Sequence, residues 1–250
     1  MSRIAIISDV HGNALALRAV LEDISWCSVD RIVCLGDVVG YGPDPVECLS
    51  LVEAHCEVCI RGNHEDAILV PEQASGFNNK ARAALSWTAS RLELSELNQI
   101  RSMPTWYHLD SDIVCVHDSP VPQDGHGYIR SRADATPVLH AMDHRICLFG
   151  HTHLPAIFTV DPALRNVRAA RLLPRTGELV RLDRAGRYLL NPGSVGQPRD
   201  GDWRASWGLL DLEAMNFSTH RSAYEVSSVR HAIACAGLPS SLGERLLIGA

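Results

Sequence analysis

Short groups of Asp, His and Asn residues stand where apolar stretches of the chain end. These groups are Asp9-Val10-His11, Gly36-Asp37, Gly62-Asn63-His64-Glu65, His117 and Gly150-His151-Thr152-His153. Carboxylate, imidazole and amide ligands together suit Mn²⁺, Fe or Zn²⁺, whereas Mg²⁺ and Ca²⁺ prefer oxygen ligands alone. A Gly-Asp or Gly-Asn pair by itself is an ordinary turn. Five groups in succession, however, predict one transition-metal site.

The spacing within the groups predicts how the ligands are shared. Side chains two residues apart in a strand point to the same side, so Asp9 and His11 would offer a carboxylate and an imidazole to one cation. The same alternation predicts one shared cation for His151 and His153. Asp37 has two carboxylate oxygens and is therefore able to bridge two cations.

Strands and helices alternate along the first two thirds of the chain, as in βαβ units. We expect strands at residues 3–8, 31–35, 57–60, 112–116 and 145–149, and helices at 14–24, 45–54, 78–101 and 133–141. Asp44 would cap the second helix, with Pro45 in its first position. Because the carboxyl ends of strands in an open α/β sheet meet at one edge, the five groups would share one crevice.

After His153 the pattern changes to short strands separated by turns. We expect a β-meander at residues 157–160, 170–173, 179–183 and 188–190, then strands at 207–212 and 217–224 and a closing helix at 229–236. No repeat or long linker interrupts the sequence. The pattern predicts an α/β fold in a single domain over residues 1–250, with two packed sheets and helices outside.

Composition limits the class of protein. The chain has 250 residues and a net charge of −6, which argues against non-specific binding to nucleic acid. The apolar run after the N-terminus, Ile4 to Ile7, is too short for a signal peptide or a membrane span. Several of the eight cysteines, such as Cys34 and Cys115, lie in apolar runs and read as reduced core residues. We therefore expect a cytoplasmic protein without a membrane partner.

In this order, the groups resemble those of the calcineurin-like metallophosphoesterases. That superfamily has a four-layer α-β-β-α sandwich fold with two mixed β-sheets. The segment Asn191-Pro192-Gly193-Ser194-Val195-Gly196 and the compact size resemble the small prokaryotic phosphodiesterases of the superfamily, and extend the match to about residue 212. The resemblance implies a metal-dependent phosphoesterase acting on a small phosphate ester, with phosphodiesters favoured over monoesters.

The resemblance also implies a role for each candidate residue. It divides the ligands between two divalent ions of Mn, Fe, Ni or Zn: Asp9, His11 and His153 for one, Asn63, His117 and His151 for the other, and Asp37 for both. A hydroxide between the metals would attack phosphorus in line. His64 would stabilise the transition state or protonate the leaving group.

Two positions depart from the pattern of relatives. In the phosphoprotein phosphatases the Gly-Asp pair continues with Val-Asp-Arg-Gly, which supplies an Asp that orients the catalytic His and an Arg that binds phosphate. Here the continuation is Val38-Val39-Gly40-Tyr41-Gly42, which weakens the protein phosphatase interpretation and leaves the partner of His64 open. Asp118 follows His117, where relatives commonly have Gly, so Asp118 could tune or crowd the second metal.

Other residues are expected around the site rather than in it. Tyr41 lies in a loop expected to rim the cleft, and the segment from Asn191 to Gly196 is expected to turn close to the metals. Arg130, Arg132 and Arg199 are interpreted as solvated or ion-paired, with phosphate binding as the alternative.

Three other functions remain as alternatives: a phosphomonoesterase or protein phosphatase, a nuclease, and a non-catalytic metal-binding scaffold such as the retromer subunit of this superfamily. The lack of a basic stripe disfavours the nuclease. The scaffold is disfavoured because His64 and all the ligand positions are filled.

Overall fold

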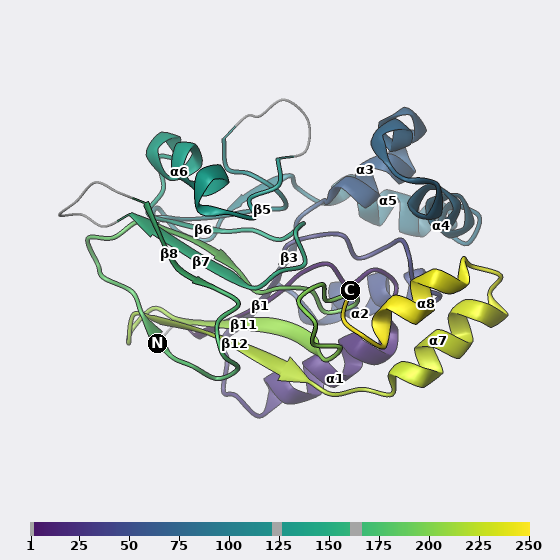
Figure 1. Cartoon of the computed structure of the whole chain (residues 1–250). Coiled ribbons are helices and arrows are strands. Elements are labelled where there is room, and N and C mark those ends of the chain that lie inside the picture. The colour runs from purple at the N-terminus through teal and green to yellow at the C-terminus, as the bar shows by residue number, and fades with distance from the viewer. Residues whose placement is uncertain (1–2, 122–126, 161–166) are drawn as a thin grey trace.

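Two mixed β-sheets stack face to face at the centre of the molecule (Figure 1). The computed structural model describes residues 3–121, 127–160 and 167–250. The first sheet has the order β3-β2-β1-β11-β12-β9, and its strands are β1 (Arg3–Ile7), β2 (Arg31–Cys34), β3 (Val58–Cys59), β9 (Val180–Arg181), β11 (Ala205–Asp211) and β12 (Asn216–Ser222). The second has the order β4-β5-β6-β10-β7-β8, and its strands are β4 (Trp106–His108), β5 (Ile113–Val116), β6 (Ile146–Leu148), β7 (Ala156–Val160), β8 (Val167–Leu172) and β10 (Tyr188–Asn191).

Helices cover the outer faces of both sheets. On the first sheet lie α1 (Ala14–Ser25), α2 (Pro45–His55), α7 (Val226–Cys235) and α8 (Ser240–Leu246), while α6 (Arg132–Ala141) lies on the second (Figure 1). The remaining helices are α3 (Asn63–Leu69), the 3₁₀ helix η1 (Pro71–Gly76), α4 (Asn79–Ala89) and α5 (Leu94–Ser102). No helix in the described ranges is long and apolar enough to cross a membrane.

Side-chain alternation along the strands builds the layers. In β1, Ile4 and Ile6 belong to the core between the sheets, whereas Ala5 and Ile7 belong to the core beneath α1 and α2. In β5, Cys115 faces the other sheet and Val114 packs in the α6 core. The molecule therefore has four layers with an apolar core between each pair of neighbouring layers. This confirms the predicted α-β-β-α sandwich of two mixed sheets.

The helical region expected over residues 78–101 consists of two helices. The first, α4, ends at Ala89, and Glu93 is extended at the start of α5. The Glu96 carboxylate accepts a hydrogen bond from the Glu93 amide at 2.8 Å, which starts a new helix there. At the start of α2, Asp44 occupies the cap position, but its side chain makes no capping hydrogen bond.

The expected β-meander after His153 is wrong beyond its first pair of strands, β7 and β8, which are antiparallel neighbours. Strand β10 lies between β6 and β7 and is parallel to β6, while β9 joins the other sheet through β12. All four residues of β10 are buried. The turn residues on either side of β10 are the same for a central strand as for a strand of a hairpin. Local turn signals therefore could not show that β10 lies in the middle of the sheet.

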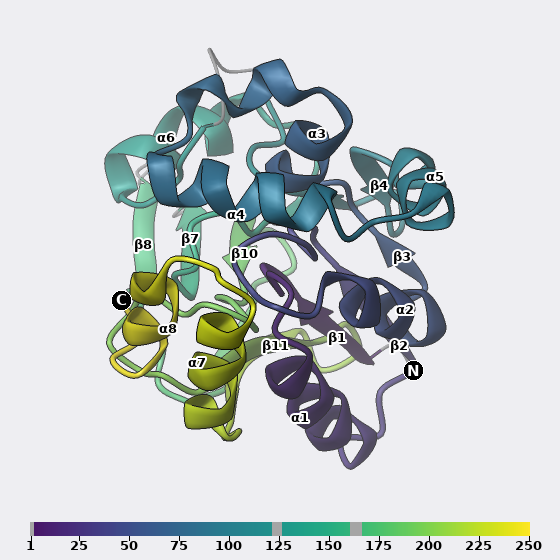
Figure 2. The same ribbon diagram turned by 90° about the vertical axis from the view of Figure 1, so that its right-hand side faces the viewer.

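Three parallel strands in each sheet end on the same side of the sandwich. They are β1, β2 and β3 in the first sheet, and β5, β6 and β10 in the second. Figure 2 shows α4 on one side of this region and α7 with α8 on another. The loops that follow these strand ends carry the predicted polar groups.

Candidate metal centre

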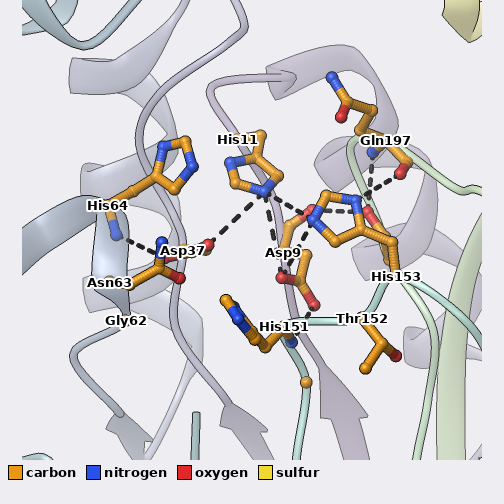
Figure 3. A network of polar contacts seen from close by, with 12 residues as sticks. Asp9, His11, Asp37, Gly62, Asn63, His64, His151, Thr152, His153 and Gln197 are labelled. Atoms are coloured by element: carbon orange, nitrogen blue, oxygen red, sulfur yellow. Dashed lines mark hydrogen bonds and ion pairs between the residues drawn. The ribbon is translucent and has the colours of Figure 1, made fainter. Parts of the chain in front are cut away.

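The predicted ligands gather beyond the carboxyl ends of the parallel strands. Ligand atoms within 4.8 Å of one another form three buried groups: Asp9 with His11 and His153, His11 with Asp37 and His64, and Asp37 with His117 and His151. Asn63 joins the third group, because its Oδ1 lies 3.0 Å from Nε2 of His117. Figure 3 shows His11 between His64 and His153. The structure therefore brings together every candidate residue proposed from the sequence.

The first group presents lone pairs to one point. Nδ1 of His11 donates to the Val39 carbonyl at 3.1 Å, and Nδ1 of His153 donates to the Gln197 carbonyl at 2.6 Å. Each proton is thereby fixed on Nδ1, and the two Nε2 atoms face each other at 3.1 Å. Asp9 Oδ1 lies 3.4 Å from Nε2 of His153 and has no hydrogen-bond partner among the described residues, although it is fully buried. Three acceptors without a donor fit a bound cation.

The second group is arranged in the same way. His117 donates from Nδ1 to the Leu35 carbonyl at 2.8 Å, so its Nε2 faces inward. That nitrogen lies 3.2 Å from Nδ1 of His151 and 3.3 Å from Oδ2 of Asp37. The same Asp37 oxygen lies 3.7 Å from Nε2 of His11 in the first group. Asp37 therefore lies between the two groups.

The backbone, rather than strand alternation, directs these ligands. Strand β1 ends at Ile7 and β6 ends at Leu148, before the ligands begin. Left-handed backbone conformations with φ between 49° and 64° are found at Asp9, His11, Asp37, His151 and His153. The alternation argument for His151 and His153 is wrong, because they join different groups. Non-glycine residues seldom adopt such φ values, which cluster at functional sites.

The loop after β10 binds the first group from the other sheet. The Gly196 amide and the Ser194 hydroxyl both donate to the Asp9 carbonyl, at 3.0 and 2.8 Å. The Asn191 side chain donates to the Gly150 carbonyl at 2.7 Å. The segment expected to turn near the metals therefore does so, and it ties the ends of β1 and β6 together.

Glu65 joins the segments that follow β2 and β3 of the first sheet, and it was given no role from the sequence. Its side chain is fully buried and accepts hydrogen bonds from three backbone amides: Asp37 at 2.9 Å, Val39 at 3.0 Å and Gly62 at 2.8 Å. These amides belong to the two loops that carry Asp37 and Asn63. The position of Glu65 directly after the Gly-Asn-His group was the signal that could have revealed this role. A carboxylate so close to buried ligands is rarely buried itself unless it is paired.

Burial sets the protonation of the metal-free centre. It raises the pKa of Asp9 to about 7, and the charge of Asp37 adds to that rise. It also lowers the pKa values of His11 and His153 well below 6.5. Burial opposes charge on Asp37 and His117 too, but their mutual attraction outweighs it, which lowers the pKa of Asp37 and raises that of His117. A cation would have to displace the protons held here.

A cavity of about 120 Å³ opens onto the centre. Asp37, His64 and His153 line it together with Tyr41 and Phe77. The His64 ring lies 4.7 Å from the Tyr41 ring and 5.1 Å from the Phe77 ring, measured between centroids. The His64 amide donates to Asp37 Oδ1 at 2.9 Å. Aromatic contacts and this backbone bond therefore place His64 at the cavity wall, and Tyr41 lines the cleft as expected.

Tyr128 completes another wall and carried no signal in the sequence. Its ring stacks on His151 with centroids 4.1 Å apart, and the Arg130 guanidinium lies 3.9 Å from the same ring.

Two other residues considered from the sequence lie outside the ligand groups. Arg132 is the first residue of α6. Asp118 accepts a hydrogen bond from the Ser119 amide at 2.7 Å and belongs to none of the three ligand groups.

Comparison with known proteins identifies the chain. A model of the calcineurin-like phosphoesterase superfamily domain matches residues 2–215. The chain belongs to this superfamily. MJ0912, an uncharacterised protein of Methanocaldococcus jannaschii, is 33% identical over 252 residues, which cover 99% of this chain and 98% of the relative.

Two further similarities concern a solved structure and a curated enzyme. The crystal structure of a metallophosphoesterase from Sphaerobacter thermophilus is 40% identical, with a TM-score of 0.85, and the match covers 100% of this chain and 99% of that one. Phosphodiesterase YfcE of Escherichia coli is 25% identical over 227 residues, 86% of this chain and 91% of YfcE. The buried His and Asp groups are thus consistent with the metal site typical of the superfamily.

Replacing Glu65 by Gln should destabilise the metal-free protein. The substitution places an NH₂ group opposite a backbone amide, and leaving a buried amide unpaired costs about 1–3 kcal/mol. Urea denaturation would measure the loss. Glu53→Gln, on the exposed surface of α2, is the matched control and should change the free energy of unfolding by less than about 0.5 kcal/mol. Equal losses in both variants would contradict the role of Glu65.

The metal-free protein should lose stability as the pH rises from 6.5 to about 8. Asp9 and Glu65, each with a pKa raised to about 7, and His117, with a raised pKa, hold more protons when folded than when unfolded in this range. The lowered pKa values of His11 and His153 oppose this slope only just above 6.5, where the unfolded histidines still hold some protons, and the groups with raised pKa values outweigh them. Urea midpoints measured with chelator across this range should fall steadily, and a rise would oppose the assignment.

Gly40→Ala should displace His64 without removing the ligands. A Cβ atom at position 40 would lie 2.1 Å from Nδ1 of His64, and Gly40 has a φ of +87°. If His64 transfers a proton, kcat should fall by about 100-fold or more while metal content is kept. Gly237→Ala is the control, because Gly237 also has a positive φ (+72°) but no atom within 4 Å of its added Cβ. Equal kcat values in the two variants would show that activity does not depend on the space that Gly40 leaves for the His64 ring.

Proposed function

We propose that this chain is a phosphoesterase that hydrolyses phosphate esters at a centre of two divalent metal ions. The observation that carries the proposal is the position of Asp37, whose Oδ2 lies 3.3 Å from Nε2 of His117 and 3.7 Å from Nε2 of His11. A carboxylate between two sets of inward-facing imidazoles suits a ligand shared by two cations. A site for one ion would need only one of these sets.

The proposed ligand sets follow the groups in the structure. Asp9, His11 and His153 would hold one ion, Asn63, His117 and His151 the other, and Asp37 both. Imidazole, carboxylate and amide ligands favour Mn, Fe, Ni or Zn. When bound, such ions lower the pKa of a water molecule and screen the charge that develops on phosphoryl oxygens.

His64 is the proposed general acid. It lies at the wall of the cavity, where it would reach the leaving-group oxygen of an ester placed against Asp37. Its backbone bond to Asp37 Oδ1 keeps the imidazole at a constant position relative to the ligands. Gly40 leaves room for the ring, and Tyr41 and Phe77 limit its rotation.

Phosphodiesters are the favoured substrates in this proposal. The support is the similarity to phosphodiesterase YfcE over 86% of the chain. Phosphomonoesters are the second candidate, because a cavity of about 120 Å³ has room for a phosphoryl group and few further atoms. A non-catalytic scaffold is disfavoured, since His64 and every proposed ligand face the same centre.

Metal restoration tests the proposal. Protein stripped with chelator should cleave neither bis-p-nitrophenyl phosphate nor p-nitrophenyl phosphate, and Mn²⁺, Fe²⁺, Ni²⁺ or Zn²⁺ added singly should restore cleavage. Asp37→Asn should lose metal, and His64→Ala should keep metal but lose activity by about 100-fold or more. His140→Ala, exposed on α6, is the control for removing a histidine. Full activity in both site variants would refute the assignment, as would two bound ions without turnover on any ester.

A further inference from the structure

Arg199 lies in the cavity, not on the solvated surface where the sequence placed it. It lines the cavity together with Asp37, His64 and His153. Burial lowers the pKa of His153, and the positive charge of Arg199 lowers it further, as it also does for His11. The guanidinium therefore lies close to the first ligand group.

No carboxylate neutralises Arg199 within the described part of the chain. Its neighbours along the same loop behave differently, because Arg204 pairs with Asp202 at 2.6 Å and Arg221 pairs with Asp200. Arg199 makes one side-chain hydrogen bond there, from Nη2 to Oε1 of Gln197 at 3.0 Å. Its Nε is buried and has no acceptor among those residues. A guanidinium has five donors, and a buried donor without an acceptor is costly.

The loop that positions His153 also positions Arg199. The Gln197 carbonyl accepts from His153 Nδ1 at 2.6 Å, while the Gln197 side chain accepts from Arg199. The Arg199 amide donates to the His153 carbonyl at 3.3 Å. The guanidinium is therefore held in a constant position relative to the ligand groups before any substrate arrives, which reduces the entropy lost on binding.

We propose that Arg199 binds a non-bridging oxygen of the substrate phosphoryl group and selects for a terminal, dianionic phosphate. This inference rests on the proposed function. The planar guanidinium matches phosphate oxygens and strengthens its hydrogen bonds with their charge. A monoester has three non-bridging oxygens and a diester has two. If one oxygen faced each ligand group, a monoester would keep a third for Arg199, whereas a diester would have none left. Arg199 is thus a specificity-determining residue that acts between the two candidate substrate classes of the proposed function, and it favours monoesters, the second candidate, over diesters.

Arg199→Gln tests the inference in the metal-loaded protein. We expect kcat/KM for p-nitrophenyl phosphate to fall by about 10- to 100-fold, since hydrogen bonds to charged groups are among the stronger ones. The value for bis-p-nitrophenyl phosphate should fall less than about threefold, and metal content should not change. Arg199→Lys keeps the charge but not the planar fork, and should recover part of the monoester activity. Arg101→Gln, on the exposed face of α5, controls for the loss of one positive charge.

Binding of inorganic phosphate separates this inference from the proposed function. Calorimetry should show weaker phosphate binding to Arg199→Gln than to wild type, by a factor similar to the monoester loss. Arg199-dependent phosphate binding without hydrolysis of any ester would support the inference and refute the proposed function. Unchanged phosphate binding, loss of metal from Arg199→Gln, or equal losses for the two esters would each overturn the inference.

Discussion

The buried carboxylate of Asp37 is the group on which the rest of the centre depends. A carboxylate removed from water must be paired, and here it lies between His11 and His117. Its other oxygen accepts the His64 amide, and its own amide is bound by Glu65. Several contacts therefore fix the conformation of the loop that carries Asp37. These contacts stabilise the left-handed backbone conformation of Asp37, which residues other than glycine rarely adopt.

The four-layer architecture brings the two ligand sets together. The segments that follow the parallel strands of one sheet carry Asp9, Asp37 and Asn63, and those that follow the parallel strands of the other carry His117 and His151. The matched superfamily domain ends at residue 215, but α7 and α8 beyond it pack against the same region, where Leu242 and Leu246 line a small cavity with His11 and Tyr41. These helices support the side of the centre that the two sheets leave open.

The cleft differs from that of the phosphoprotein phosphatases in how His64 is held and in which loop supplies a positively charged side chain. The loop after Asp37 lacks their Asp and Arg, and instead Gly40 makes space for His64 while Tyr41 and Phe77 contact its ring. Arg199, from a loop of the other sheet, supplies a positive charge in the cavity. A chain with a net charge of −6 thus keeps a cationic group in the cavity beside the ligand groups.

The sequence alone determined the superfamily, the layered α/β fold and the candidate ligands, because each of these depends on residue type and local order along the chain. The resemblance placed His151 and His153 in different groups, but strand alternation wrongly placed them in one, because left-handed backbone conformations at these residues override the alternation of a strand. The sequence also could not place β10 beside β6, find the role of Glu65, or decide whether Arg199 is solvated or lines the cavity. These features arise from contacts between segments far apart in the chain, and whether a polar side chain is buried and what it faces is decided only when the two sheets pack together.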